Sequence, residues 1–252
     1  MFRAMSFHRF MRMPAAAIAL AAALLLPFAG AQAGAAKRPI VVELFTSQGC
    51  DSCPPADAIL GQLATTRKDV LAMSLPITYW DMLGWRDTLA SEADTKRQKA
   101  YAQAMGHGGV YTPEMIVDGI SDVVGSREAQ VDQAIATRAA DAQNVPVNVS
   151  ATKTEVRVTV GSSESRDDAT IWFFRLLPQA SVTVTAGENA GHTMTYRNVV
   201  RDIRAVGMWK GQPVTLDLPR EDLIGKSRDS IAVVVQQGGY GRIVGAAVMD
   251  GH

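Results

Sequence analysis

The sequence has few cysteines, few histidines and no excess of charge. Its 252 residues include two cysteines and four histidines, and 25 basic residues balance 25 acidic ones. Two cysteines exclude a disulfide-rich scaffold, and no spacing supplies the four closed ligands of a structural zinc site. The balanced charge, without a long run of one sign, gives no indication of a nucleic-acid partner.

Long apolar runs are also scarce. The apolar run over residues 15–26 is too short for a comfortable membrane span, and Ala-Gln-Ala at 31–33 fits a small-x-small cleavage site. The run follows three basic residues, Arg3, Arg9 and Arg12. We therefore predict a signal peptide over 1–33, export to the periplasm or the extracellular space, and no stable membrane insertion after cleavage. An uncleaved anchor is the alternative.

The two cysteines, Cys50 and Cys53, lie three residues apart between an apolar strand-like run (40–45) and a helix-like run (56–63). Backbone amides and the positive end of a helix dipole favour thiolate at such a turn. As a staple, the pair closes a short loop and contributes only about 2 kcal/mol, against about 3 for fifteen residues. The spacing therefore favours redox or ligand chemistry over stabilisation alone.

Strand and helix signals alternate in the first half, with expected strands at 70–77 and 115–117 and helices over 95–105 and 126–139. Ser91 is a predicted N-cap, Gly106 a helix stop, and Asp118-Gly119 a hairpin turn. This pattern predicts a compact α/β domain over residues 34–143. After a linker near 142–145, short alternating strands predict an all-β antiparallel sandwich-like domain over 144–252. The expected strands there are 145–149, 155–160, 170–177, 181–185, 214–218, 231–236 and 243–248.

The order strand, CxxC, helix, strand, helix and then Thr112-Pro113 before a hairpin resembles the thioredoxin superfamily. The resemblance implies a thioredoxin-like domain, a cis peptide bond before Pro113, and a Thr112 backbone that contacts substrate. We expect Cys50 to attack a disulfide and Cys53 to resolve the mixed disulfide. Asp51 opposes thiolate formation at Cys50, which favours a mid-range or reducing couple.

Glu43 is the one charge within the first strand-like run. A buried carboxylate near a dithiol can accept the proton of the resolving thiol. In thioredoxin-like proteins an acid often occupies this strand, which implies such a catalytic role for Glu43. A solvated position at a strand edge is the alternative.

An aromatic loop follows the second strand, and we expect it to line a substrate groove at the dithiol edge of the sheet. Packing beneath the loop is the alternative. The candidate substrate-binding residues, besides Thr112 and Pro113, are Trp80, Asp81, Trp85 and Tyr111.

The whole chain also resembles a group of predicted secreted bacterial proteins with a thioredoxin-like domain and no assigned function. This likeness involves the segments 43–50, 79–85, 97–101, 111–113, 187–191 and 195–200. It implies an envelope location and supplies no substrate.

The sequence as a whole predicts an exported thiol–disulfide oxidoreductase acting on a protein or small-molecule thiol or disulfide. We expect no organic cofactor, because the electrons pass through the dithiol, and no resident metal. Two alternatives remain: a non-catalytic binding protein on the same scaffold, and a copper chaperone in which His107 assists the two cysteines.

Overall fold

The computed structural model describes residues 1–2, 37–141, 143–164, 167–225 and 228–251. The predicted signal peptide, apart from its first two residues, lies outside the described residues. Residues 36–252 form one compact unit. Among the described residues, no helix has the length and apolar character needed to cross a membrane.

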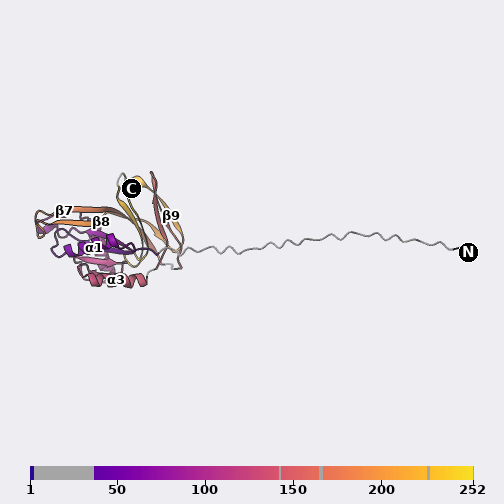
Figure 1. Ribbon diagram of the computed structural model, residues 1–252, viewed down its shortest axis with the longest axis horizontal. Helices are drawn as coiled ribbons and strands as arrows, with labels where there is room; N and C mark the ends of the chain where they lie inside the picture. Colours follow the sequence, from indigo (N-terminus) through magenta and orange to yellow (C-terminus); the bar gives the residue numbers. More distant parts are fainter. Residues whose placement is uncertain (3–36, 142, 165–166, 226–227, 252) are drawn as a thin grey trace. The chain divides into compact units, whose positions relative to one another are not determined.

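The first half of the chain has the predicted order of elements (Figure 1). Its elements are β1 (Ile40–Thr46), α1 (Pro54–Thr66), β2 (Val70–Pro76), the 3-10 turn η1 (Asp81–Leu83), α2 (Glu92–Met105), β3 (Glu114–Val117), β4 (Ser121–Val124) and α3 (Glu128–Ala140). The local predictions at the ends of α2 are confirmed. The Ser91 side chain accepts from the Asp94 amide, and Gly106 ends the helix in a left-handed conformation, φ 73°.

The second half consists mainly of strands. They are β5 (Val147–Ala151), β6 (Glu155–Val160), β7 (Ala169–Thr183), β8 (Thr193–Trp209), β9 (Val214–Pro219), β10 (Ser230–Gln237) and β11 (Ile243–Met249), with a short helix α4 (Arg220–Leu223). The two strands expected at 170–177 and 181–185 form one continuous strand, β7, which ends at Thr183. Strand β8 was not predicted at all.

The predicted fold class, a thioredoxin-like α/β domain followed by a separate sandwich-like domain, is wrong. Within the described residues, the strands of both halves share one eight-stranded sheet of order β11-β10-β7-β8-β2-β1-β3-β4. The sheet is continuous because β8 lies beside β2, with Ser74 paired to Val199 and the Asn198 side chain donating to the Ala72 carbonyl (2.9 Å). If the second half were a separate domain, the edge of β2 would be open. In the structure, β8 of the second half covers this edge.

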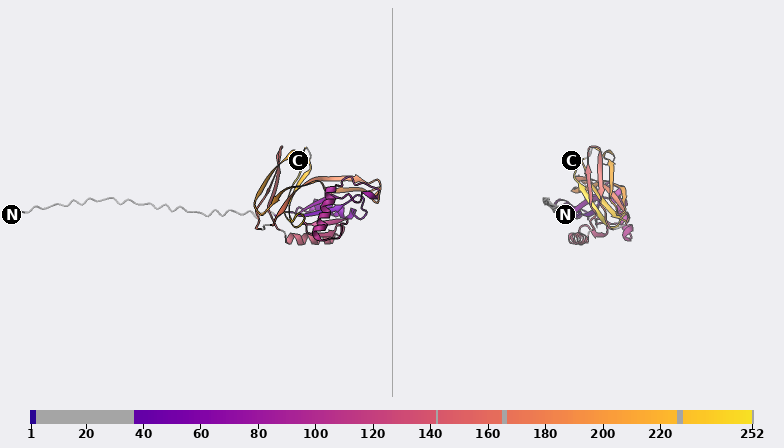
Figure 2. Two further views of the ribbon diagram at one scale, coloured as in Figure 1. Left: turned by 180° about the vertical axis from the view of Figure 1, so that it is seen from behind. Right: turned by 90° about the vertical axis from the view of Figure 1, so that its right-hand side faces the viewer.

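Two layers cover different parts of one face of this sheet. Helices α1 and α3 pack on Val42 and Leu44 of β1, and the three-stranded sheet β5-β6-β9 packs on Phe173 of β7 and Val233 of β10. The opposite face buries a core that includes Phe45 of β1 and is covered in part by α2 (Figure 2). The sandwich-like packing exists, but it is built on the shared sheet.

The sheet bends back so that its edge strand β11 reaches the β3–β4 turn. Asp118 and Gly119 have positive φ angles of 52° and 79°, the geometry of a tight hairpin turn. The Asp118 carbonyl accepts from the Ile243 amide (3.0 Å). A Cβ on Gly119 would lie 2.1 Å from the Gly241 carbonyl oxygen, so this approach requires glycine.

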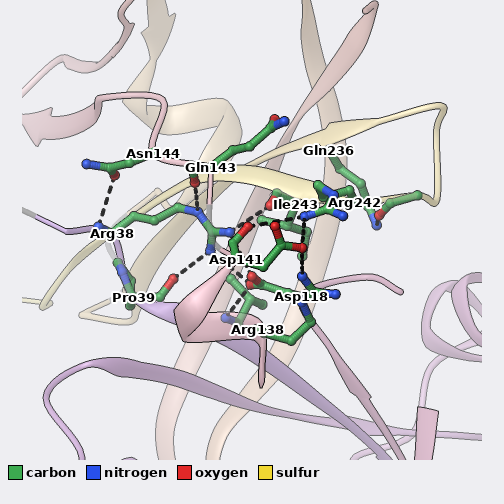
Figure 3. Close-up of polar contacts among 12 residues, drawn as sticks. Arg38, Pro39, Asp118, Arg138, Asp141, Gln143, Asn144, Gln236, Arg242 and Ile243 are labelled. Carbon is green, nitrogen blue, oxygen red and sulfur yellow. Dashed lines mark hydrogen bonds and ion pairs between the residues drawn. The ribbon is translucent and has the colours of Figure 1, made fainter. Parts of the chain in front are cut away.

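A buried ion pair fixes the same junction (Figure 3). The Arg38 guanidinium donates to both carboxylate oxygens of Asp118 at 2.9 and 2.7 Å, and the two side chains are 3% and 2% exposed. Arg38 also donates to the carbonyls of Gln143 and Ile243, both at 2.8 Å. One side chain thereby joins the start of β1, the β3–β4 turn, the end of the α3 segment and β11.

We predict that Asp118→Asn lowers the free energy of unfolding by about 3–5 kcal/mol, because it leaves the buried Arg38 charge without a counter-ion. Asparagine also tolerates the left-handed backbone of this position, so the substitution tests the charge and not the turn. Urea unfolding at neutral pH measures the loss. The exposed pair Arg67–Asp69 provides the matched control, for which Asp69→Asn is expected to cost under about 1 kcal/mol. Equal losses in the two variants would contradict the prediction.

Candidate functional site

The two cysteines form a disulfide at the start of α1. Cys53 is the N-cap of the helix, and its carbonyl accepts from the amides of Ala56 and Asp57. Pro54 is the first helical residue, a position at which the missing N–H costs nothing. Both cysteines are buried, Cys50 at 3% exposure and Cys53 completely, so Cys50 is the more exposed of the two.

The Thr112–Pro113 peptide bond is cis, as the resemblance implied. The Thr112 hydroxyl lies 3.3 Å from the Cys50 sulfur. The Trp80 indole N–H in turn donates to the Thr112 hydroxyl oxygen at 2.7 Å. The structure therefore brings together Cys50, Thr112 and Trp80 from three separate segments.

The other members of the predicted groove have different surroundings. Trp85 donates its indole N–H to the Gln48 side chain (2.8 Å), and Asp81 accepts from the Asp87 amide (3.0 Å). The Tyr111 hydroxyl donates to Asp122 of β4 (3.2 Å). Trp80 and Trp85 thus support the dithiol loop by packing and hydrogen bonding.

A residue of the second half, Asn189, also holds the dithiol loop. It lies between β7 and β8, is 5% exposed, and donates its side-chain N–H groups to the carbonyls of Gln48 and Cys50, both at 2.9 Å. The sequence prediction missed it. Its surroundings in the sequence, Gly187-Glu188-Asn189-Ala190-Gly191, indicate only a turn. The burial of Asn189 within that turn is visible only in the structure.

Glu43 is fully buried, which excludes the solvated strand edge. Its carboxylate forms an ion pair with Arg97 of α2 (2.5 Å) and accepts from the Tyr101 hydroxyl (2.5 Å). Neighbouring β1 residues show its direction, because Val41 and Phe45 contact the core on the α2 side while Val42 and Leu44 contact the α1 side. Glu43 therefore points to the α2 side of the sheet, and Cys53 begins the helix on the other side.

Asp57 is a buried carboxylate close to the dithiol, and the sequence prediction missed it. It lies one helical turn after Cys53, and neither carboxylate oxygen has a hydrogen-bond partner among the described residues. Burial raises the pKa of Asp57 well above its usual value, the nearby Thr46 hydroxyl offsets this in part, and the Asp87 charge adds to it. An acid in the first turn of a helix is explained by its interaction with the helix dipole, so nothing in the sequence singles out Asp57.

A cavity of about 640 Å³ lies beside this helix start. The α1 end contributes Asp51, Pro54, Pro55, Asp57 and Ala58, and the β7–β8 hairpin contributes Asn189 and residues 192–195. The lining combines apolar ring and methyl groups with the exposed carboxylate of Asp51.

We predict that Asp57→Asn stabilises the protein at neutral pH. A buried acid whose pKa is raised binds its proton more tightly in the folded state, so stability falls as pH rises from the unfolded pKa, near 3.8, through the folded value. The variant should lose less unfolding free energy than the wild type between pH 4 and pH 7, and should gain about 1–3 kcal/mol at pH 7. Urea unfolding at both pH values measures this. Asp51→Asn, at an exposed position of the same loop, is the control and should follow the wild type. A variant less stable than the wild type at pH 7 would contradict the prediction.

No curated protein matches the chain. Protein AGR_C_4864 from Agrobacterium tumefaciens is similar, with 35% identity and a TM-score of 0.74 over 86% of this chain and 96% of that one. HBP35 of Porphyromonas gingivalis shares the fold at 14% identity, with a TM-score of 0.60 over 85% of this chain and 75% of that one. The model of a family described as protein of unknown function, DUF1223, matches residues 41–236. The chain belongs to the DUF1223 family.

Proposed function

We propose that the protein is an exported thiol–disulfide oxidoreductase in which Cys50 attacks and Cys53 resolves. The observation that carries the proposal is the convergence of distant segments on one cysteine, Cys50. Thr112 reaches the Cys50 sulfur, and Asn189 holds the Cys50 carbonyl. A pair of cysteines that served only as a staple would not need such an organised surrounding. The likeness of this centre to that of the thioredoxin superfamily, with its CxxC and cis-proline, also supports the proposal.

The proposed reaction transfers two electrons from the dithiol to a substrate disulfide. The Cys50 thiolate attacks one substrate sulfur, the substrate S–S bond breaks, and one substrate thiolate leaves. The Cys53 thiolate then attacks the Cys50 sulfur of the mixed disulfide, which releases the second substrate thiolate and restores the Cys50–Cys53 disulfide. A separate thiol reductant reverses the sequence to reload the dithiol, and in the opposite direction the same steps oxidise a dithiol substrate.

The buried Cys53 thiol must lose a proton before it attacks. Glu43 is engaged by Arg97 on the other side of the sheet. Asp57 is on the same helix face as Cys53, since residues four apart on a helix have Cβ atoms about 5–6 Å apart. We assign to Asp57 the role of accepting the Cys53 proton and passing it towards the leaving thiolate, in place of the role first expected for Glu43.

The cavity beside α1 suggests the class of substrate. Its lining combines Pro54, Pro55 and Met194 with the exposed carboxylate of Asp51. Such a surface suits a disulfide or thiol that carries apolar or cationic neighbours, on a polypeptide or a small molecule, better than an anionic one.

The reduction potential of Cys50–Cys53, measured by glutathione equilibration and thiol trapping, tests the redox proposal. We expect a value between about −120 and −270 mV, the range of working exchange catalysts. Cys50→Ser should abolish exchange, and Cys53→Ser should accumulate a mixed disulfide at Cys50. A potential well below about −300 mV marks an inert disulfide and would favour a non-catalytic binding protein.

The role of Asp57 has its own test. Asp57→Asn should slow resolution of the mixed disulfide at neutral pH while leaving the attack by Cys50 unchanged, and it should shift the pH profile of the resolving step. The matched control is Asp94→Asn, since Asp94 is likewise a buried carboxylate without a hydrogen-bond partner among the described residues, but lies on α2. If both variants behave alike, the effect is one of stability and Asp57 has no part in proton transfer.

A further inference from the structure

Three potential metal ligands gather at the start of β3, outside the dithiol. They are His107, in the segment after α2, Glu114, the first residue of β3, and Asp122 of β4. One ligand atom from each lies within 4.8 Å of those of the other two. Glu114 pairs with Val124 across the hairpin, so Asp122 is its diagonal neighbour on the same face of the two strands.

Among the contacts of the described residues, one oxygen of each carboxylate accepts from a neighbouring side chain. Gln98 donates to Oε2 of Glu114 (2.7 Å), and the Tyr111 hydroxyl donates to Oδ2 of Asp122 (3.2 Å). Gln98 is itself fixed, because it also donates to the Tyr111 carbonyl (2.7 Å). Outer partners that orient carboxylates in this way are typical of metal sites, where they leave the remaining oxygen for the ion.

The charges in this cluster also favour a cation. Glu114 is 1% exposed, so its carboxylate forms the buried wall of the cluster. The Nε2 of His107 lies 3.9 Å from Oδ1 of Asp122. Two carboxylates and one imidazole leave a net negative site when the imidazole is neutral, and a divalent ion offsets that charge.

The geometry allows an ion to enter. The His107 and Asp122 side chains are 35% and 32% exposed, while Glu114 forms the buried side of the cluster. Ligands about 2.0–2.2 Å from zinc lie about 3.3–3.6 Å apart in a tetrahedral site. The 3.9 Å between His107 and Asp122 is close to this spacing, and both partly exposed side chains have room to close around an ion.

We propose that His107, Glu114 and Asp122 bind one divalent transition-metal ion, with water completing its coordination. Mixed imidazole and carboxylate ligands suit zinc and manganese, and zinc is expected to bind more tightly. The site is independent of the proposed redox activity. Its ion would, however, fix the segment from Tyr111 to Glu114, which includes the Thr112 that contacts Cys50.

Zinc titration of the untagged chain tests the site. The Cys50–Cys53 disulfide is kept oxidised, so that the cysteines cannot serve as ligands, and bound metal is first removed by a chelator. We expect calorimetry to show one zinc per chain, and the melting temperature to rise with zinc concentration by mass action. A chelator should reverse the shift.

Three variants separate the proposed site from surface binding. His107→Ala and Asp122→Asn, at partly exposed positions, should each lower zinc affinity at least about tenfold, the smallest loss expected even for an outer partner. His192→Ala, at an exposed histidine beside the α1 cavity, should leave the affinity unchanged. No heat and no thermal shift at about 1 mM zinc, or equal affinities in the wild type and in the His107 and Asp122 variants, would overturn the proposal, whatever the outcome of the redox tests.

Discussion

The architecture depends on the buried ion pair between Arg38 and Asp118. A guanidinium at this depth requires a counter-ion and acceptors for its remaining N–H groups, and the acceptors come from segments far apart in the chain (Figure 3). Asp118 can reach Arg38 only if the β3–β4 turn is in place, and the Ile243 carbonyl only if β11 has returned to that turn. The buried Arg38 charge therefore has its counter-ion and its acceptors only when the sheet has bent back and β11 lies at the β3–β4 turn.

This closure makes the two halves of the chain depend on each other. Strand β8 lies beside β2, and the long hairpin that it forms with β7 extends to the dithiol loop, where Asn189 holds two carbonyls. The second half is thus a structural part of the dithiol centre. In physical terms, the loop carrying Cys50 has hydrogen bonds that require the β7–β8 hairpin to be in place.

Features set by neighbouring residues could be predicted from the sequence. The Ser91 cap, the Gly106 stop, the Asp118-Gly119 turn and the strand–CxxC–helix order all depend on interactions within a few residues. Strand β8 was not predicted because charged residues interrupt its alternation of apolar and polar residues. Some of these charged residues have partners that lie far away in the chain. Arg201, for example, donates to the Leu89 carbonyl (2.7 Å), 112 residues away in the chain. Glu43 was predicted as a redox acid for the same reason, since nothing near it in the sequence reveals that Arg97 neutralises it.

The chain of contacts from Trp80 to Cys50 has a consequence for the sulfur. An indole N–H can only donate, so the Thr112 oxygen must accept from Trp80. The single hydroxyl proton of Thr112 is then left to point at the Cys50 sulfur, 3.3 Å away. Once the disulfide is reduced, a hydroxyl proton held in this direction would favour the Cys50 thiolate over the thiol. Trp80, which does not contact Cys50 by a hydrogen bond of its own, thereby orients the Thr112 hydroxyl towards the Cys50 sulfur.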